Sequence, residues 1–147
     1  MNLLTGTYSQ DNLPYCLGQK YDIGTTVTES LQAEGAINFG DAVAKGTLSG
    51  HGVQLNNVSQ KFRGVALKTH TIGTGKGYVQ YDPVSVIRQG RVPVQVIEAV
   101  TDGDAAYACV ASPGKFCKTA TGNVATGGIF RADAAANSIA ILDINLP

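Results

Sequence analysis

Glycine and proline divide this chain into short runs of β-branched residues, and that spacing constrains the fold more than any other feature. The 147 residues include 18 Gly and 5 Pro, which are spread along the chain rather than gathered in one linker. The runs between them are rich in Val, Ile and Thr, whose branched side chains suit a pleated sheet. No window keeps a helical period of apolar residues. The sequence therefore predicts an all-β sandwich or barrel with little helix.

Seven segments are candidate strands and two short segments are the best candidates for helix. The strand candidates are residues 36–44, 64–69, 84–88, 92–100, 105–110, 116–119 and 138–146. The helix candidates are residues 28–34 and 132–137. The chain length suits one domain, which we place at residues 36–147 as a single β-sandwich.

Valines alternate in the middle of the chain, and two arrangements of this stretch remain open. In the first, residues 88–90 form a hairpin loop, so that Val86 pairs with Val92 and all the alternating valines face one core. In the second, one long strand is bulged at Gly90. Pro93 points away from the valine face and cannot donate a ladder hydrogen bond, which predicts a sheet edge at this residue.

The first 35 residues form an irregular N-terminal segment in our prediction. They carry apolar and aromatic side chains with neither a strand period nor a helix period. Two interpretations remain open, because the segment either packs as irregular coil on its own domain or extends as an arm to a neighbouring molecule. We take this segment and the Pro93 edge as candidate protein interfaces. The candidate residues are Leu3, Leu4, Tyr8, Leu13, Tyr15, Leu17 and Pro93.

The charge balance argues against several kinds of partner. The 11 Lys and Arg residues equal the 11 Asp and Glu residues, and charged residues make up only 15% of the chain. Without a basic field to attract phosphates, we expect no direct contact with nucleic acid or with a membrane. We also expect no signal peptide and no membrane span. A surface this poor in charge is suited to burial against protein partners.

The three cysteines are expected to be reduced and buried, as in a protein made in a cytosol. Their odd number and the absence of a Cys-x-x-Cys pair indicate no disulfide framework. A turn over residues 112–115 would pair Cys109 with Lys118 and Val110 with Cys117. The two thiols would then lie on opposite faces of the hairpin, which predicts no internal disulfide.

No motif for a chemical reaction passes a test of its spacing. The glycine-rich loop at 71–78 has Tyr78 where a dinucleotide fingerprint needs its third glycine, and its spacing does not fit a phosphate loop. His51 lies in a predicted turn at residues 49–52, where we expect it to be exposed, and neither it nor His70 shows metal-ligand spacing. The aspartates of residues 102–104 lack the rest of a calcium loop. No nucleophile elbow is present. We therefore predict no enzyme activity, no cofactor and no metal.

Five segments carry a family resemblance when they are taken together in their order. They are residues 37–43 (INFGDAV), 62–67 (FRGVAL), 81–90 (YDPVSVIRQG), 103–107 (GDAAY) and 139–146. No single one of them is specific, but the ordered series resembles the structural cement, or capsid decoration, proteins of tailed bacteriophages. The resemblance covers roughly residues 30 to 147 and does not assign the N-terminal segment.

The resemblance implies a jelly-roll-like β-sandwich without enzymatic activity. It further implies a homo-oligomer on the outer surface of the icosahedral head of the virion, where it stabilises contacts between subunits of the major capsid protein. We expect a homodimer across capsid two-folds, with a trimer at three-folds as the alternative. The protein would be synthesised in the cytoplasm of the bacterial host. Deletion of residues 1–17 should weaken capsid attachment while the domain stays folded.

Two other functions remain as alternatives. A glycan- or receptor-binding β-sandwich module of the virion would need exposed tyrosines gathered beside polar groups. A small hydrolase would need His51 or His70 within hydrogen-bond reach of a Cys or Ser in a cleft.

Overall fold

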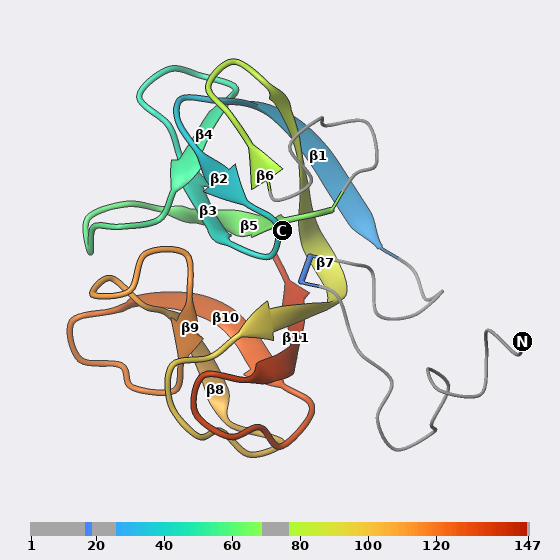
Figure 1. Ribbon diagram of the computed structural model, residues 1–147, viewed down its shortest axis with the longest axis vertical. Coiled ribbons are helices and arrows are strands. Elements are labelled where there is room, and N and C mark those ends of the chain that lie inside the picture. Colours follow the sequence, from blue (N-terminus) through green and yellow to red (C-terminus); the bar gives the residue numbers. More distant parts are fainter. Residues whose placement is uncertain (1–16, 19–25, 69–76, 147) are drawn as a thin grey trace, which may run out of the picture.

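The computed structural model describes residues 17–18, 26–68 and 77–146, and every regular element in these ranges is a β-strand (Figure 1). The strands are β1 (Val27–Ala33), β2 (Ile37–Asn38), β3 (Ala42–Lys45), β4 (His51–Gln54), β5 (Phe62–Ala66), β6 (Gly77–Tyr78), β7 (Pro83–Gln95), β8 (Ala105–Ala108), β9 (Phe116–Cys117), β10 (Val124–Phe130) and β11 (Ile139–Asn145). The predicted all-β class is therefore confirmed. The jelly-roll arrangement in particular stays a prediction.

The long strand β7 takes part in two groups of strands. Its first half pairs with β1 and β5, and the pairings β1–β4–β3–β5–β7 return to β1, so these strands close on themselves. Its second half pairs with β11, which leads on to β10, β8 and β9. A bridge between Val96 and Phe116 connects β9 back to the end of β7. Figure 1 shows the two groups as the upper and lower halves of the molecule, with β7 running through both.

Two hydrophobic cores lie on opposite faces of β3 and β5. Along β3, Ala42 and Ala44 face the larger core, whereas Val43 between them faces the smaller one. The smaller core lies within the upper group and includes Leu31, Phe39 and the ring of Tyr78, which meets Phe39 edge to face. The larger core joins the outer face of β3 and β5 to the strands of the lower group. Burial of apolar surface in the larger core is what holds the two groups together.

The alternating valines of β7 are divided between these two cores. Val84 and Val86 pack in the smaller core, whereas Val92, Val94 and Val96 pack in the larger one. The pairing with β1 skips Arg88, and a bulge at that point changes the face to which even-numbered side chains point. The hairpin interpretation was therefore wrong. The long-strand alternative is confirmed, although the break in pairing falls at Arg88 and not at Gly90.

Several strands form where the sequence predicts something else. β1 takes most of the helix candidate 28–34 and lies within the segment expected to be irregular, because pairing with β7 outweighs local helix propensity. β4 begins at His51, where a turn is expected, and β10 was not predicted at all. Residues 132–137 form no helix. The division into an N-terminal segment and one β-sandwich domain stays a prediction.

Candidate contact surfaces

Five of the predicted interface residues fall outside the described residues, namely Leu3, Leu4, Tyr8, Leu13 and Tyr15. Leu17 is half-buried, and Pro93 is buried. The Gly18 amide donates a hydrogen bond to the Pro93 carbonyl (3.2 Å), and the Gly18 carbonyl accepts one from the Lys68 amide (2.9 Å). Residues 17–18 thus already cover β7 at Pro93, so a partner strand would have to displace them. The interface role of these seven residues stays a prediction.

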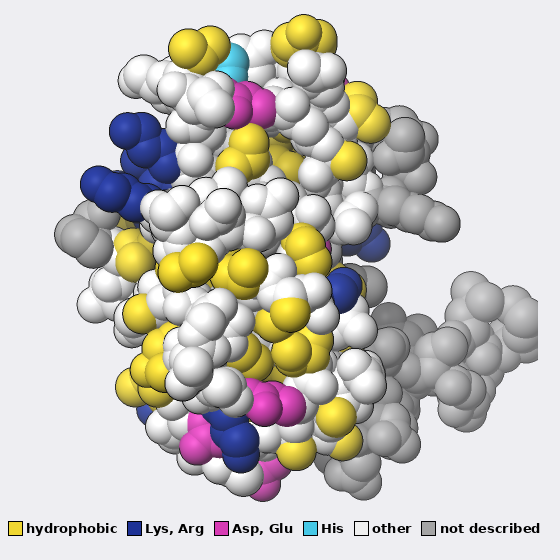
Figure 2. All heavy atoms as spheres, turned by 90° about the vertical axis from the view of Figure 1, so that its left-hand side faces the viewer, with side chains coloured by type: hydrophobic (Ala, Val, Ile, Leu, Met, Phe, Trp, Pro, Cys, Tyr) yellow, Lys and Arg dark blue, Asp and Glu magenta, His cyan; other side chains and the backbone are white. Residues whose placement is uncertain are grey.

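One end of the molecule carries the loops that follow β3 and β6 (Figure 1). Three large apolar side chains are exposed on these loops, Leu48 to 61%, Val79 to 50% and Tyr81 to 70% of their surface. Figure 2 shows hydrophobic side chains at this upper end beside a histidine and acidic side chains. We refer to Leu48, Val79 and Tyr81 as the tip surface.

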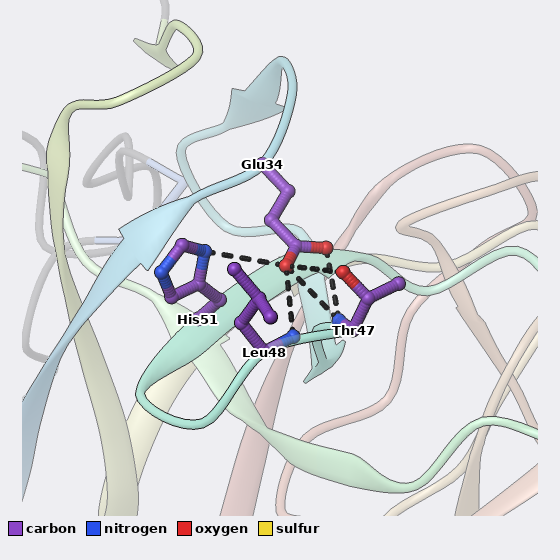
Figure 3. A network of polar contacts seen from close by, with 4 residues as sticks. All are labelled: Glu34, Thr47, Leu48 and His51. Carbon is purple, nitrogen blue, oxygen red and sulfur yellow. Dashed lines mark hydrogen bonds and ion pairs between the residues drawn. The ribbon is translucent and has the colours of Figure 1, made fainter.

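Glu34 fastens the first of these loops to the end of β1 (Figure 3). Its carboxylate accepts hydrogen bonds from the amides of Thr47 (3.0 Å) and Leu48 (3.2 Å) and from the Thr47 hydroxyl (2.8 Å). Its Oε2 also lies 3.2 Å from Nδ1 of His51, which is half-buried rather than exposed on a turn as expected. The Thr47 amide is the main cause of the lowered pKa of Glu34, against the opposing effect of burial. The charged carboxylate therefore holds Leu48 on a defined backbone.

Tyr81 stands on the second loop in a left-handed conformation. Its φ is 74°, a region that is costly for a residue with a Cβ atom. The Tyr81 amide donates a hydrogen bond to the Ala33 carbonyl (2.8 Å), and the Asp82 carboxylate accepts one from the Val79 amide (2.9 Å). These bonds keep the turn in place and leave the ring exposed. Exposed aromatic side chains on a rigid backbone are typical anchors of protein interfaces.

Asp41 is a buried carboxylate at the contact between the upper and lower groups. Only 3% of its surface is exposed, and its Oδ2 accepts hydrogen bonds from the Asn38 amide (2.9 Å) and the Gln54 side chain (2.6 Å). Burial raises the pKa of this carboxyl group, although both hydrogen bonds oppose the shift. Next to it, the Ala42 amide donates to the carbonyl of Gly114 in the β8–β9 turn (3.0 Å). These contacts are structural, because they join the two groups.

Among the described residues, the side chains that could support a metal site or a hydrolase are not gathered into one. Within residues 17–18, 26–68 and 77–146, no three His, Cys, Asp or Glu side chains are placed to hold a metal ion. The contact of His51 is with a carboxylate and not with a Cys or Ser. His70 and residues 71–76 of the glycine-rich loop lie outside the described residues. The described part of the chain contains no helix that is long and apolar enough to cross a membrane.

The described tyrosines do not form a glycan-binding platform. Tyr78 is buried and its hydroxyl donates to the Leu67 carbonyl, while Tyr107 is half-buried on β8. Of the tyrosines that the structure describes, Tyr81 alone is largely exposed. The other three, Tyr8, Tyr15 and Tyr21, lie outside the described residues.

The described residues define an all-β protein with apolar side chains exposed on hydrogen-bonded loops. The chain belongs to the phage family of structural cement proteins, because the family model described as "Structural cement protein (E217 gp24/Pam3 gp6)" matches residues 4–145. Its role is that of a capsid cement or decoration protein, and its place is the virion capsid. The resemblance seen in the sequence is confirmed. The match begins at residue 4, so it also includes the N-terminal segment that the resemblance left unassigned.

A solved structure has a similar fold. It comes from "The capsid of Myoviridae Phage XM1", with a TM-score of 0.74 and 19% identity over 98% of each chain. At this identity the likeness supports the fold alone. No curated protein matches the chain.

Proposed function

We propose that this protein binds the outer surface of the icosahedral head and stabilises contacts between neighbouring subunits of the major capsid protein, with the tip surface as a principal contact. The observation that carries this proposal is the exposure of Leu48 and Tyr81 on loops held by hydrogen bonds. A preorganised apolar surface loses little conformational freedom on binding. A ligand that binds only the assembled shell stabilises it by mass action, and repeated contacts over many copies add avidity.

In this proposal the protein acts as a homodimer across capsid two-folds, with a trimer at three-folds as the alternative. It catalyses no reaction and needs no cofactor. Its formal net charge of zero supports a role without direct contact to nucleic acid or membrane. Synthesis takes place in the cytoplasm of the bacterial host, where the protein joins the head.

The test compares a tip variant with a matched control on heads that lack this protein. The tip variant combines Leu48→Ser with Tyr81→Asn, because Asn tolerates the left-handed backbone at this position. The control is Val58→Ser, on the loop between β4 and β5, where the side chain is 62% exposed. We expect the tip variant to bind at least about 10-fold more weakly, and the control to bind like wild type.

Binding is measured by titrating each protein onto purified heads and determining occupancy by cryo-electron microscopy. The same maps give the side of the shell and the symmetry axis that the protein occupies. Unchanged melting temperatures show that both variants are folded. Equal occupancy of the tip variant and the wild type would contradict the role of the tip surface, as would an equal loss in the control.

A further inference from the structure

The register of β8 and β9 brings two cysteines to the same face of the hairpin. Tyr107 pairs with Cys117, and the Cys109 amide donates to the Lys115 carbonyl (2.8 Å). Side chains two residues apart on a strand share a face, so Cys109 lies on the same side as Cys117. The sequence-based pairing with Lys118, which placed the thiols on opposite faces, is therefore wrong. Both cysteines are free and buried, and besides burial the neighbouring Cys109 adds to the raised pKa of the Cys117 thiol.

Both thiols line one cavity of about 450 Å³, which is bounded by Ile97, Val110 and Asn123 among others. The cavity offers a small molecule a route to sulfur atoms that are otherwise covered. Each sulfur is also held in position. The Ser112 amide donates to Sγ of Cys109 (3.4 Å), and the Asn123 side chain donates to Sγ of Cys117 (3.3 Å).

We propose that Cys109 and Cys117 are a site of oxidative modification at which an intramolecular disulfide forms once the particle has left the reducing cytoplasm of its host. With hydrogen peroxide as oxidant, the thiolate of one cysteine attacks a peroxide oxygen and hydroxide leaves, which gives a sulfenic acid. The thiol of the other cysteine attacks that sulfur, and its proton leaves with the hydroxyl group as water. Two thiols and one peroxide thus become one disulfide and two waters.

Burial of Cys117 makes its oxidation slow, and the reducing cytosol keeps the pair reduced before assembly. Burial raises the pKa of the Cys117 thiol to about 11, so very little thiolate is present at neutral pH. Cytosolic reductants keep such thiols reduced during synthesis, whereas a released virion is exposed to an oxidising medium. A disulfide formed in this cavity would be shielded from large reductants by the same burial.

The cross-link would stabilise a hairpin on which the contact between the two groups of strands depends. In this hairpin, the Gly114 carbonyl accepts a hydrogen bond from the Ala42 amide. Phe116 forms a β-bridge with Val96 at the end of β7. A disulfide across residues 109–117 restricts the unfolded chain, which raises the free energy of unfolding. For a chain of this length we expect the melting temperature to rise by about 5 °C.

The test uses the full chain with Cys16→Ser, which removes the third thiol. The protein is treated with hydrogen peroxide at pH 7 and pH 9, then alkylated, weighed intact and mapped by peptide mass spectrometry. We expect an intact mass lower by about 2 Da, with no alkylation of either cysteine and a 109–117 cross-linked peptide. Oxidation that begins at Cys117 should become about 10-fold faster per pH unit between pH 7 and pH 9, since both pH values lie well below the pKa of its thiol. The melting temperature of the oxidised protein should be about 5 °C higher than that of the reduced protein.

Matched controls carry Cys109→Ser or Cys117→Ser in the same background, and the corresponding Ala variants are used if a Ser variant is unfolded. These controls should show neither the mass loss nor the rise in melting temperature. Sulfinic acids, intermolecular disulfides or two unreacted thiols in the folded double-cysteine protein would overturn the proposal. Because the experiment uses the isolated protein, its outcome is independent of the proposed contact between the tip surface and the capsid.

Discussion

At the scale of single residues, the upper and lower groups are tightly packed at Asp41 and Gly114. Gly114 has a φ of +82°, and a Cβ atom added to it would lie 2.5 Å from Cγ of Asp41. Any side chain at residue 114 must therefore displace a carboxyl group that is itself fixed by the Asn38 amide and the Gln54 side chain. A single glycine thus sets how closely the β8–β9 turn approaches β3.

We predict that Gly114→Ala lowers the free energy of unfolding by about 3 kcal/mol, because backbone strain adds to a steric clash in the interior. The matched control is Gly122→Ala, whose φ of +75° is similar but whose added Cβ would meet nothing within 4 Å. That control should lose only about 1 kcal/mol. Urea unfolding followed by circular dichroism measures both values. Equal losses in the two variants would show that the contact with Asp41 does not matter.

At the scale of elements, three carboxylates near the surface hold loops to strand ends. Glu34 is the first of them. Oε1 of Glu98 accepts hydrogen bonds from the amides of Lys118 (2.8 Å) and Thr119 (2.9 Å), and the Asp104 carboxylate accepts one from the amide of Thr101 (2.9 Å). These hydrogen bonds, led for Glu98 by the Thr119 hydroxyl, lower the pKa of each of the three carboxyl groups. The loops therefore depend on negative charge that acid removes.

A carboxyl group whose pKa is lower in the folded state than in the unfolded state stabilises the protein at pH values above its unfolded-state pKa. This stabilisation is lost as the pH falls through the folded-state pKa. Glu98 has an ordinary pKa of 4.5, so its contribution should disappear as the pH falls below that value. The raised pKa of Asp41 acts in the opposite sense, favouring the folded state in acid. We predict that Glu98→Gln, which keeps an acceptor oxygen, melts below wild type at pH 6, and that the difference shrinks toward about pH 3.

Melting temperatures from pH 3 to pH 7 measure this effect. Asp102→Asn serves as the control, because Asp102 is an exposed aspartate whose replacement removes the same charge. Its difference from wild type should stay small throughout. A Glu98→Gln difference that does not change with pH would show that the charge of Glu98 is not what holds the loop.

Elements with their own strand pattern could be predicted, and elements made by pairing could not. The candidate strand 138–146 corresponds closely to β11, because most of its residues are apolar and three of them are isoleucines. β10 was missed since its Thr-Gly-Gly stretch hides the alternation, and it forms through pairing with β8 and β11. β1 was missed because its local sequence is also compatible with a helix. Local propensity is a weak guide when partners are distant in the chain.

At the scale of the whole molecule, the open question is whether the N-terminal segment is an arm or packs on its own domain. Gly18 is hydrogen-bonded to Pro93 and Lys68, so a truncation should end before it. We predict that deletion of residues 1–16 leaves the melting temperature within about 2 °C and weakens binding to heads by at least about 10-fold. Titration onto heads measures this binding. Unchanged occupancy would rule out the arm, and a lower melting temperature would favour packing on the domain itself.

Composition, alternation and the order of short segments are enough to establish the all-β class, the family and the balance of charges. The division of the β7 valines between two cores, the shared face of Cys109 and Cys117, and the tip surface are visible in the folded chain alone. Each of these depends on register or on a bulge, and a shift of one residue moves every side chain of a strand to the other face. Register is set by partners far apart in the chain, so no local pattern contains it.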